Sequence, residues 1–387
     1  MESGIPRMNL YLYLKHFPLY REQLTGGPEK AVHGLASGLA ACGDQVTVLC
    51  EGSENSLMQS EEGYNIRCFA TDQSLPAFTV SKHLKHYIAH QMKQSLVILN
   101  GIFHPSVFAI SRLLRKHQLP YIVAPHDPYH PSIFRKKAHL KWPYWYLIER
   151  RLLRQAKAVQ VLDIRHGDWL RRLKVSTSVI EIPNGFALDE VRAESSLRWS
   201  KEGVATVFYL GRLDSHHKGL DLLIDAMAQL PNVFAVRLVM QGPDWGDRGS
   251  LEARVAQLQL GNRVSFLCAD YDRSAPEIIV NYDIFCLPSR FDGFGLSALE
   301  AMLAGRVLLV SKFSGIAPHV QASGCGVVVR PEAPSIQQGL RELLERRSKW
   351  KDMGMAGRRY ALTHLQWKTL AYRARGYYQN LAAVGMC

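Results

Sequence analysis

Short runs of β-branched and other apolar residues alternate along the chain with longer segments whose apolar residues recur every three or four positions. The runs have the length of buried strands, and the longer segments have the period of amphipathic helices. Such alternation predicts parallel sheets with helices on both faces. Strands are expected near residues 8–14, 45–50, 65–69, 95–99, 120–124, 157–161, 178–182, 204–210, 234–241, 263–267, 283–288, 306–311 and 326–329. Helices are expected near residues 29–41, 79–93, 105–117, 142–156, 164–173, 219–230, 249–259, 275–281, 297–304 and 335–347.

The pattern breaks after the Ile-Pro-Asn-Gly sequence at 182–185, where a polar segment without a strong period follows. A chain of 387 residues is long enough for two domains. We therefore expect a first domain over 1–190 and a second over 191–364. A last helical stretch over 365–387 has no following strand, and we expect it to pack back toward the first domain.

The segment from Phe291 to Glu300 joins an expected strand to a helix that begins at about Ser297. Its Gly-Phe-Gly turn lies between two carboxylates, Asp292 and Glu300, and Glu300 is placed in the first helical turn. Backbone N–H groups at a helix N-terminus favour an anion, and carboxylates can bind sugar hydroxyls. The segment therefore fits a phosphorylated sugar. It fits equally a Ser297–Glu300 capping box, so the motif alone decides nothing.

A second loop follows the strand expected at 204–210. It contains Arg212 and Lys218 between Gly211 and Gly219, and glycines permit tight turns. Two cations at the carboxyl end of a strand can clamp a diphosphate, the arginine as a fork and the lysine as a point charge. The alternative is a pair of solvated loop cations, and the residues alone favour neither interpretation.

Two weaker signals lie in the first half. Gly26 and Gly27 precede the helix expected from Glu29, where backbone N–H groups again suit an anion, although a plain turn explains them as well. His126 follows the strand expected at 120–124, and a structural histidine is the simpler interpretation. No histidine pair has the spacing of an H-E-x-x-H metal site.

In this order the elements resemble the family-4 retaining glycosyltransferases of the GT-B fold, over residues 8 to about 330. The matching features are Gly26-Gly27, His126, the sequence at 182–185, the loop from Gly211 to Gly219, Pro288-Ser289, and the segment from Asp292 to Gly305. The resemblance implies an α/β protein of two Rossmann-like, doubly wound parallel-sheet domains facing each other across a cleft. The first domain would bind the acceptor and the second the nucleotide-sugar donor.

The resemblance also implies roles for single residues. Arg212 and Lys218 would hold the donor diphosphate, and Glu300 would bind the ribose hydroxyls. Asp292 and His126 would contact the transferred sugar near its reacting carbon. The donor-binding set is completed by Gly27, Gly211 and the amides of Phe294, Gly295 and Leu296. The family needs no divalent metal, so we expect neither a metal nor a cofactor beyond the nucleotide sugar.

Three positions depart from the family pattern. Asp292 stands where glutamate is usual, Arg306 where proline is usual, and His319 where an acidic residue is frequent. These departures leave the donor sugar open. They also discourage assignment to a named subfamily.

The formal net charge of +13 is unevenly distributed. Residues 133–174 contain twelve Lys or Arg side chains, three acidic residues and interleaved aromatics such as Trp142 and Trp145. Such a stretch can bind an anionic membrane surface or nucleic acid, or form a solvated helix face. No nucleic-acid-binding motif accompanies it, so nucleic acid is the weaker alternative.

The seven cysteines include no C-x-x-C pair, which indicates reduced thiols, and no apolar run is long enough to span a membrane. With no export signal at the N-terminus, we expect a cytoplasmic protein, with peripheral attachment to the inner face of the cytoplasmic membrane as an alternative. The sequence is interpreted as a retaining glycosyltransferase acting on a glycan or glycolipid acceptor of the cell envelope, or on a small soluble acceptor. A non-catalytic glycan-binding protein, an RNA-binding protein and a GT-B epimerase or phosphorylase are the rival interpretations.

Overall fold

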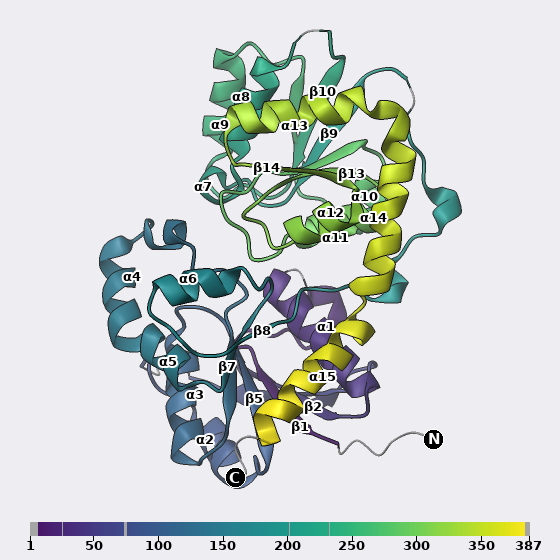
Figure 1. Ribbon diagram of the computed structural model, residues 1–387. Helices are drawn as coiled ribbons and strands as arrows, with labels where there is room; N and C mark the ends of the chain where they lie inside the picture. Colours follow the sequence, from purple (N-terminus) through teal and green to yellow (C-terminus); the bar gives the residue numbers. More distant parts are fainter. Residues whose placement is uncertain (1–6, 25, 73–75, 201, 232, 384–387) are drawn as a thin grey trace. The chain divides into compact units, whose positions relative to one another are not determined.

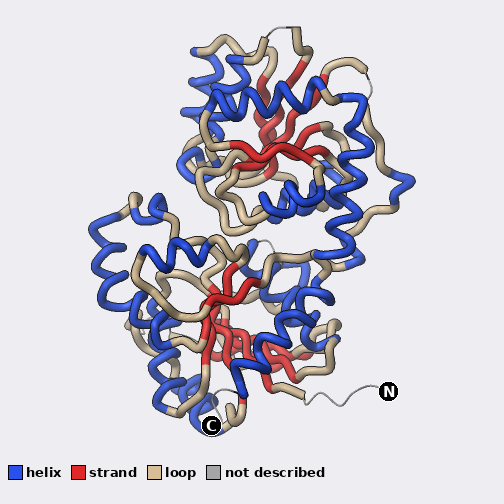
Figure 2. The backbone as a smooth tube through the Cα atoms, in the orientation of Figure 1, coloured by secondary structure: helices blue, strands red, loops and turns tan. Residues whose placement is uncertain are grey.

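The computed structural model describes residues 7–24, 26–72, 76–200, 202–231 and 233–383. The chain divides into two α/β units (Figures 1 and 2). The first comprises Met1–Phe186 and Trp367–Cys387, and the second comprises Ala187–Gln366. The chain thus leaves the first unit four residues before the boundary expected at 190 and returns to it at Trp367.

An eight-stranded sheet forms the centre of the first unit, in the order β3-β4-β2-β1-β5-β6-β7-β8. Its pairs are parallel except that of β3 with β4. Every residue of β5 is buried, as expected for a strand covered on both faces. The strands are β1 (Asn9–Tyr13), β2 (Gln45–Gly52), β3 (Ser56–Gln59), β4 (Asn65–Ala70), β5 (Ser95–Asn100), β6 (Tyr121–Ala124), β7 (Ala158–Val161) and β8 (Val179–Glu181).

Helices cover both faces of this sheet (Figure 1). They are α1 (Gly27–Ala41), α2 (Lys82–His90), α3 (Pro105–Lys116), α4 (Ala138–Tyr144), the π-helical turn η3 (Trp145–Glu149), α5 (Arg150–Gln155), α6 (His166–Arg172) and α15 (Trp367–Ala383). The 3₁₀ turns of this unit are η1 (Arg21–Gln23) and η2 (Pro131–Phe134).

The C-terminal helix α15 packs on α1, because α1 presents glycines to it. A Cβ on Gly34 would lie 2.0 Å from Trp367 Nε1, and one on Gly38 would lie 2.6 Å from Ala371 Cβ. Side chains at these two positions would therefore push the helices apart.

The second unit contains a six-stranded, fully parallel sheet in the order β11-β10-β9-β12-β13-β14. Its strands are β9 (Ala205–Leu210), β10 (Val236–Gln241), β11 (Val264–Leu267), β12 (Ile284–Leu287), β13 (Val307–Ser311) and β14 (Gly326–Val329). Its helices are α7 (Ser215–Lys218), α8 (Leu220–Gln229), α9 (Arg248–Gln257), α10 (Ala275–Ile279), α11 (Leu296–Leu303), α12 (Ala317–Ser323), α13 (Ala333–Glu345) and α14 (Trp350–His364). Its 3₁₀ turns are η4 (Leu188–Glu190), η5 (Glu194–Ser196) and η6 (Arg347–Lys349).

Both sheets are doubly wound in the Rossmann manner, which confirms the expected fold class. The winding reverses between β1 and β5 in the first unit and between β9 and β12 in the second. Ligands of such sheets bind beyond the carboxyl ends of the strands at this switch point. A ligand site is therefore expected at the loops after these four strands.

One expected helix is wrong as a single element. The segment at 142–156 is divided into the end of α4, the π-turn η3 and α5, and Pro143 lies inside α4. A proline has no N–H group to donate to the preceding turn, so the regular α-helical bonding is interrupted there.

The six cysteines in the described part of the chain are free thiols, and Cys387 lies outside it. No helix within that part is long and apolar enough to cross a membrane.

Candidate functional site

The loop after β9 delivers Arg212 and Lys218 to the switch point of the second sheet. Gly211 has a φ of 151°, and the carbonyl of Arg212 accepts a hydrogen bond of 2.8 Å from the Tyr209 hydroxyl. The short helix α7 then begins after Asp214 and ends at Gly219, whose φ of 67° suits glycine. A Cβ at Gly219 would lie 2.6 Å from Pro288 O, so this turn can approach the end of β12 only as glycine.

Lys218 meets one of the expected carboxylates there. Its Nζ lies 2.6 Å from Asp292 Oδ2, and the Ser289 hydroxyl donates to the same oxygen at 3.2 Å. Burial alone would raise the pKa of the Asp292 carboxyl, but the Lys218 charge and these hydrogen bonds lower it below its usual value. Asp292 is therefore ionised at neutral pH. A lysine ammonium has three N–H donors, so two remain for a ligand.

The neighbouring histidine adds no charge to this site at neutral pH. The His217 ring stacks on Phe291 with centroids 4.3 Å apart. Burial, followed by the nearby Lys218 charge, lowers the pKa of His217 to about 4. Arg212 and Lys218 thus contribute positive charge at this point, and His217 does not.

Arg212 is held by a residue that the sequence reasoning missed. Its guanidinium carbon lies 4.2 Å from the centroid of the Trp245 ring, in the loop after β10. The two loops are joined by Leu213 N donating to Pro243 O at 2.9 Å and by Ser215 N donating to Asp247 Oδ2 at 2.6 Å. The signal that could have found this contact is the Gly-Pro pair at 242–243, directly after an expected strand.

The Gly-Phe-Gly loop is fixed against the segment after β13. The Phe294 carbonyl accepts from Ser314 Oγ at 2.7 Å and from Ile316 N at 2.9 Å, and the Phe294 ring is buried. Gly295 has a φ of 98°, and a Cβ there would lie 2.4 Å from Leu287 Cδ2. The loop is thereby held with the amides of Phe294 to Leu296 at the start of α11.

Helix α11 begins one residue earlier than expected, which changes two interpretations. Gly295 is the N-cap residue and provides no side-chain cap, so Ser297 lies inside the helix. The Ser297–Glu300 capping box is therefore wrong, because it requires Ser297 at the N-cap. Glu300 is the fifth residue of α11 and half-buried, so its placement in the first turn is also wrong.

In the first unit, His126 lies beyond the end of β6 with a φ of 63°. Its Nε2 is 2.8 Å from Asn100 Oδ1, and Asn100 Nδ2 donates to Tyr13 O at 3.1 Å. Because the Asn100 amide nitrogen is used as a donor, its oxygen must accept, and His126 Nε2 carries the proton. Burial lowers the pKa of His126 to about 4, so the ring is neutral and its Nδ1 is an acceptor.

Gly27 is the first residue of α1, with Gly26 as the N-cap and Pro28 next in the helix. The helix thus begins two residues before the expected Glu29. Gly27 and His126 belong to the first unit. The structure brings the other expected residues together in the second unit, in the loops after β9 and β12 and at the start of α11. These are Gly211, Arg212, Lys218, Asp292, Phe294, Gly295, Leu296 and Glu300.

Arg306 and His319, the two other positions that depart from the family pattern, both contact neighbouring segments. Arg306 is buried and donates from Nε to Ala304 O at 3.0 Å and from Nη1 to Tyr282 O at 3.1 Å. Burial lowers its pKa to about 10, so it stays charged at neutral pH. His319 lies 3.2 Å from the Tyr360 hydroxyl through Nδ1, and its ring meets the Phe294 ring at 5.8 Å. His319 thus packs against the Gly-Phe-Gly loop through the Phe294 ring.

Groups of three or more His, Cys, Asp or Glu side chains able to hold a metal ion are absent from the described residues.

Known families match both halves of the chain. The family described as Glycosyl transferases group 1 matches residues 194–360, and the Glycosyl transferase 4-like domain matches residues 26–185. The glycogen synthase of Mycobacterium tuberculosis is 25% identical over 391 residues, covering 91% of this chain and 90% of that protein. The phosphatidyl-myo-inositol mannosyltransferase of the same organism is 26% identical over 218 residues. That match covers 54% of this chain and 56% of the mannosyltransferase, little more than half of each.

Among solved structures, the sucrose-phosphate synthase from Thermosynechococcus elongatus superposes with a TM-score of 0.77 at 20% identity. The superposition covers 98% of this chain and 100% of the synthase chain. The chain therefore belongs to the glycosyltransferases of the GT-B fold. The two family models fall one on each unit.

Proposed function

We propose that this glycosyltransferase takes a sugar from a nucleotide-diphosphate donor and moves it, with retention of configuration and without a metal, to an acceptor hydroxyl. The observation that carries the proposal is the ion pair of Lys218 with Asp292 at the switch point of the second sheet, with Arg212 on the same loop as Lys218 and the N-terminus of α11 shortly after Asp292. Cations and helix N–H groups at such an edge suit a diphosphate.

The chemistry follows from where charge develops. As the bond to the diphosphate lengthens, positive charge grows on the sugar ring and negative charge on the leaving oxygens. Arg212 and Lys218 stabilise the negative charge from fixed positions, which is the preorganised electrostatic effect that usually contributes most. The acceptor hydroxyl attacks from the face that the diphosphate leaves, and a diphosphate oxygen takes its proton.

Two other side chains take positioning roles in this proposal. The Asp292 carboxylate orients Lys218 and accepts a hydrogen bond from a sugar hydroxyl. Glu300 accepts hydrogen bonds from the ribose hydroxyls. Glu300→Gln is then expected to weaken binding of the nucleoside diphosphate, because a neutral amide is a weaker acceptor than a carboxylate. Calorimetric titration measures this, and unchanged affinity together with a lowered Tm would give Glu300 a structural role only.

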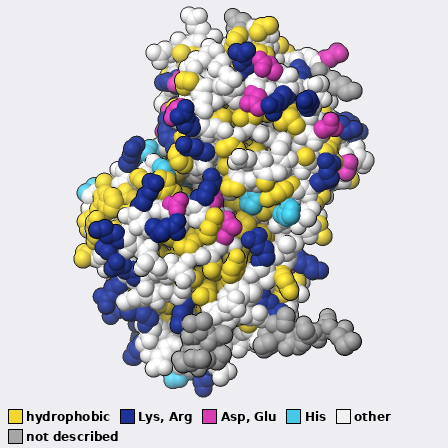
Figure 3. Space-filling view, in the orientation of Figure 1, with side chains coloured by type: hydrophobic (Ala, Val, Ile, Leu, Met, Phe, Trp, Pro, Cys, Tyr) yellow, Lys and Arg dark blue, Asp and Glu magenta, His cyan; other side chains and the backbone are white. Residues whose placement is uncertain are grey.

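The acceptor is proposed to be a glycan or glycolipid of the cell envelope, reached at a membrane surface. In the basic-aromatic segment, residues 133–174, Trp145 and Phe134 are buried in the core. Leu140, Tyr146 and Leu147 of the same segment are 59%, 62% and 72% exposed. Figure 3 shows Lys and Arg side chains gathered around hydrophobic ones on the flank that carries α4 and α5. Exposed apolar groups ringed by cations suit the boundary of an anionic bilayer.

Flotation with liposomes tests the membrane part. The wild type is expected to float with anionic and not with neutral vesicles, since each cation near such a surface contributes on the order of 1 kcal/mol. Lys136→Glu with Lys137→Glu should abolish flotation. The matched control, Lys349→Glu with Lys351→Glu, changes the charge equally in the second unit and should float normally. Equal loss in both pairs, or equal recovery with neutral lipid, would favour a soluble acceptor.

A screen of nucleotide sugars tests the catalytic part. Incubation with each sugar and analysis for free nucleoside diphosphate should identify one donor that is hydrolysed slowly without acceptor and that raises the Tm. Donor binding without any turnover, with every acceptor class offered, would favour the non-catalytic binding protein.

A further inference from the structure

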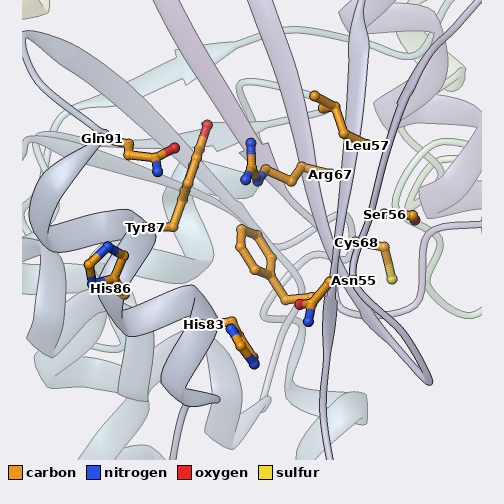
Figure 4. A pocket seen from close by; sticks show the side chains of 10 residues that line it. Asn55, Ser56, Leu57, Arg67, Cys68, His83, His86, Tyr87 and Gln91 are labelled. Atoms are coloured by element: carbon orange, nitrogen blue, oxygen red, sulfur yellow. The ribbon is translucent and has the colours of Figure 1, made fainter.

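A cavity lies in the first unit, away from the switch point of its sheet. It lies between the hairpin of β3 and β4 and the side of α2, is partly open to solvent, and has a volume of about 390 Å³ (Figure 4). Ligand pockets in proteins begin at about 300 Å³, which is room for a phosphorylated monosaccharide. Neither the fold nor the glycosyl transfer proposed above uses this cavity.

Arg67 of β4 points into the space beside α2. It shares a face of the strand with Phe69, whose ring packs against Tyr87 of α2 with centroids 5.3 Å apart. The Arg67 guanidinium carbon lies 4.5 Å from the centroid of the Tyr87 ring, so the ring supports the flat face of the guanidinium (Figure 4). The stacking holds the fork in place and leaves its N–H edge for other partners.

Within the described ranges Arg67 forms no ion pair, and its guanidinium donates no hydrogen bond. The walls add a further polar side chain, His83, one turn before Tyr87 on α2. Asp and Glu are absent from the described lining residues.

An unpaired guanidinium in a cavity without carboxylates has a clear chemical complement. A planar fork of N–H donors matches two oxygens of a phosphate. Leu57, opposite Arg67 in the β3–β4 register, provides an apolar wall for the part of the ligand that carries the phosphate. We infer that this cavity binds the phosphate group of a small phosphomonoester, with Arg67 as the fork.

Isothermal titration of the full chain tests the inference. The probes are inorganic phosphate, glucose 6-phosphate and glycerol 3-phosphate, with glucose as the uncharged control and NaCl added to equal ionic strength. The wild type should bind the phosphates and not glucose. Tighter binding of glucose 6-phosphate than of inorganic phosphate identifies a soluble sugar phosphate. Tightest binding of glycerol 3-phosphate identifies a lipid headgroup, and either order supports the site.

Variants separate this site from the proposed donor clamp. Arg67→Gln keeps the length of the side chain and should weaken phosphate binding at least tenfold. Arg115→Gln, an exposed arginine on α3, is the matched control and should bind as the wild type does. Arg212→Ala should retain the binding. If Arg212→Ala abolishes it and Arg67→Gln leaves it intact, the phosphate is bound at the clamp and the inference is overturned.

A folding defect in Arg67→Gln does not leave the question open. Arg67→Lys keeps the positive charge and removes only the fork, and it should weaken phosphate binding severalfold with an unchanged Tm. Wild-type affinity in Arg67→Lys would contradict the site.

Discussion

The carboxyl edges of the two sheets share a topology and differ in chemistry. In the first unit, the loops after β1, β5 and β6 meet through neutral groups, with Asn100 bonded to the β1 backbone and to His126. In the second unit, the loops after β9 and β12 bring together Arg212, Lys218 and Asp292. The same strand order therefore joins its switch-point loops through neutral side chains in the first unit, the neutral edge, and through an ion pair in the second, the charged edge. The fold offers two equivalent switch points, and the side chains make them chemically different.

Each unit contains a buried carboxyl, and the two differ in whether a cation lies beside them. Asp292 has Lys218 at 2.6 Å, and the pKa of its carboxyl is lowered. Glu149 of the first unit accepts from the Tyr129 hydroxyl at 2.6 Å and from Phe103 N at 3.1 Å, and among the described residues no Lys or Arg pairs with it. Burial raises the pKa of Glu149 to about 7. Both carboxyls are buried, so burial does not distinguish them. The Lys218 cation keeps Asp292 ionised, whereas the Glu149 carboxyl titrates at a pKa of about 7.

Removing a cation from the charged edge should have the largest effect. Arg212→Ala is expected to lower turnover roughly 10²–10³-fold, as expected when one preorganised donor to developing charge is lost. The Tm should hardly change, because the guanidinium packs only on an exposed ring. Steady-state kinetics beside a thermal melt measures both. Wild-type turnover in this variant would contradict the clamp.

Lys218→Ala separates catalysis from stability at the same edge. It should lose turnover to the same extent and also lower the Tm, because it leaves the buried Asp292 charge unpaired. Adding Asp292→Asn should restore much of the Tm and none of the turnover. A double variant that regains turnover would show that Lys218 serves only to neutralise Asp292.

Glu149 should make the stability of the first unit depend on pH. The pKa of Glu149 is about 7 in the folded state and 4.5 for an ordinary glutamate, so the folded state binds more protons between these values. Stability is then fully present at low pH and falls as pH rises through the folded pKa, by about 3 kcal/mol in total. Glu149→Gln should remove this slope, measured by urea unfolding at pH values from about 5 to 8. An unchanged slope would mean that the Glu149 carboxyl is not the group that titrates.

Most of the secondary structure could be predicted, since apolar periodicity reports burial directly. The exceptions have physical causes. The edge strand β3 is short and half-exposed, so it carries no apolar pattern. Helix α14 contains Gly354 and Gly357, which weaken helix propensity. They are there because a Cβ on Gly354 would lie 1.9 Å from Gly305 O, a contact between segments distant in sequence.

In the candidate site, too, contacts between residues distant in sequence could not be predicted. The loop positions of Arg212, Lys218 and Asp292 follow from strands and glycines, which are local features. Their partners are not local: Lys218 and Asp292 are 74 residues apart, and Trp245 reaches Arg212 from another strand. The start of α11 was not predicted exactly, because a Gly295 N-cap and a Ser297 N-cap, two residues apart, are both plausible in sequence. The observed Gly295 N-cap removes the capping-box alternative.

The neutral edge allows a milder test. His126→Asn keeps a residue that tolerates a φ of 63° and removes the Nδ1 acceptor. Turnover is expected to fall roughly tenfold, the size of one lost hydrogen bond. Affinity for the nucleoside diphosphate should not change, because that ligand is assigned to the second unit. Since the pKa of His126 is about 4, the wild-type rate should show no titration of this imidazole near pH 6.5. A step there that disappears in the variant would mean that His126 carries a charge.

The smallest effect is expected for Trp245, which carries no charge itself and acts on the charged edge by positioning Arg212. Trp245 is 60% exposed, and its ring makes a cation–π contact with Arg212. Such contacts contribute about 0.5–1 kcal/mol at exposed sites, so Trp245→Ala should weaken donor binding two- to fivefold. Trp245→Phe keeps an aromatic face and should recover part of the loss. In the Arg212→Ala background, Trp245→Ala should have no further effect, because the ring acts through the guanidinium. An additive loss in the double variant would instead show that Trp245 contacts the donor itself.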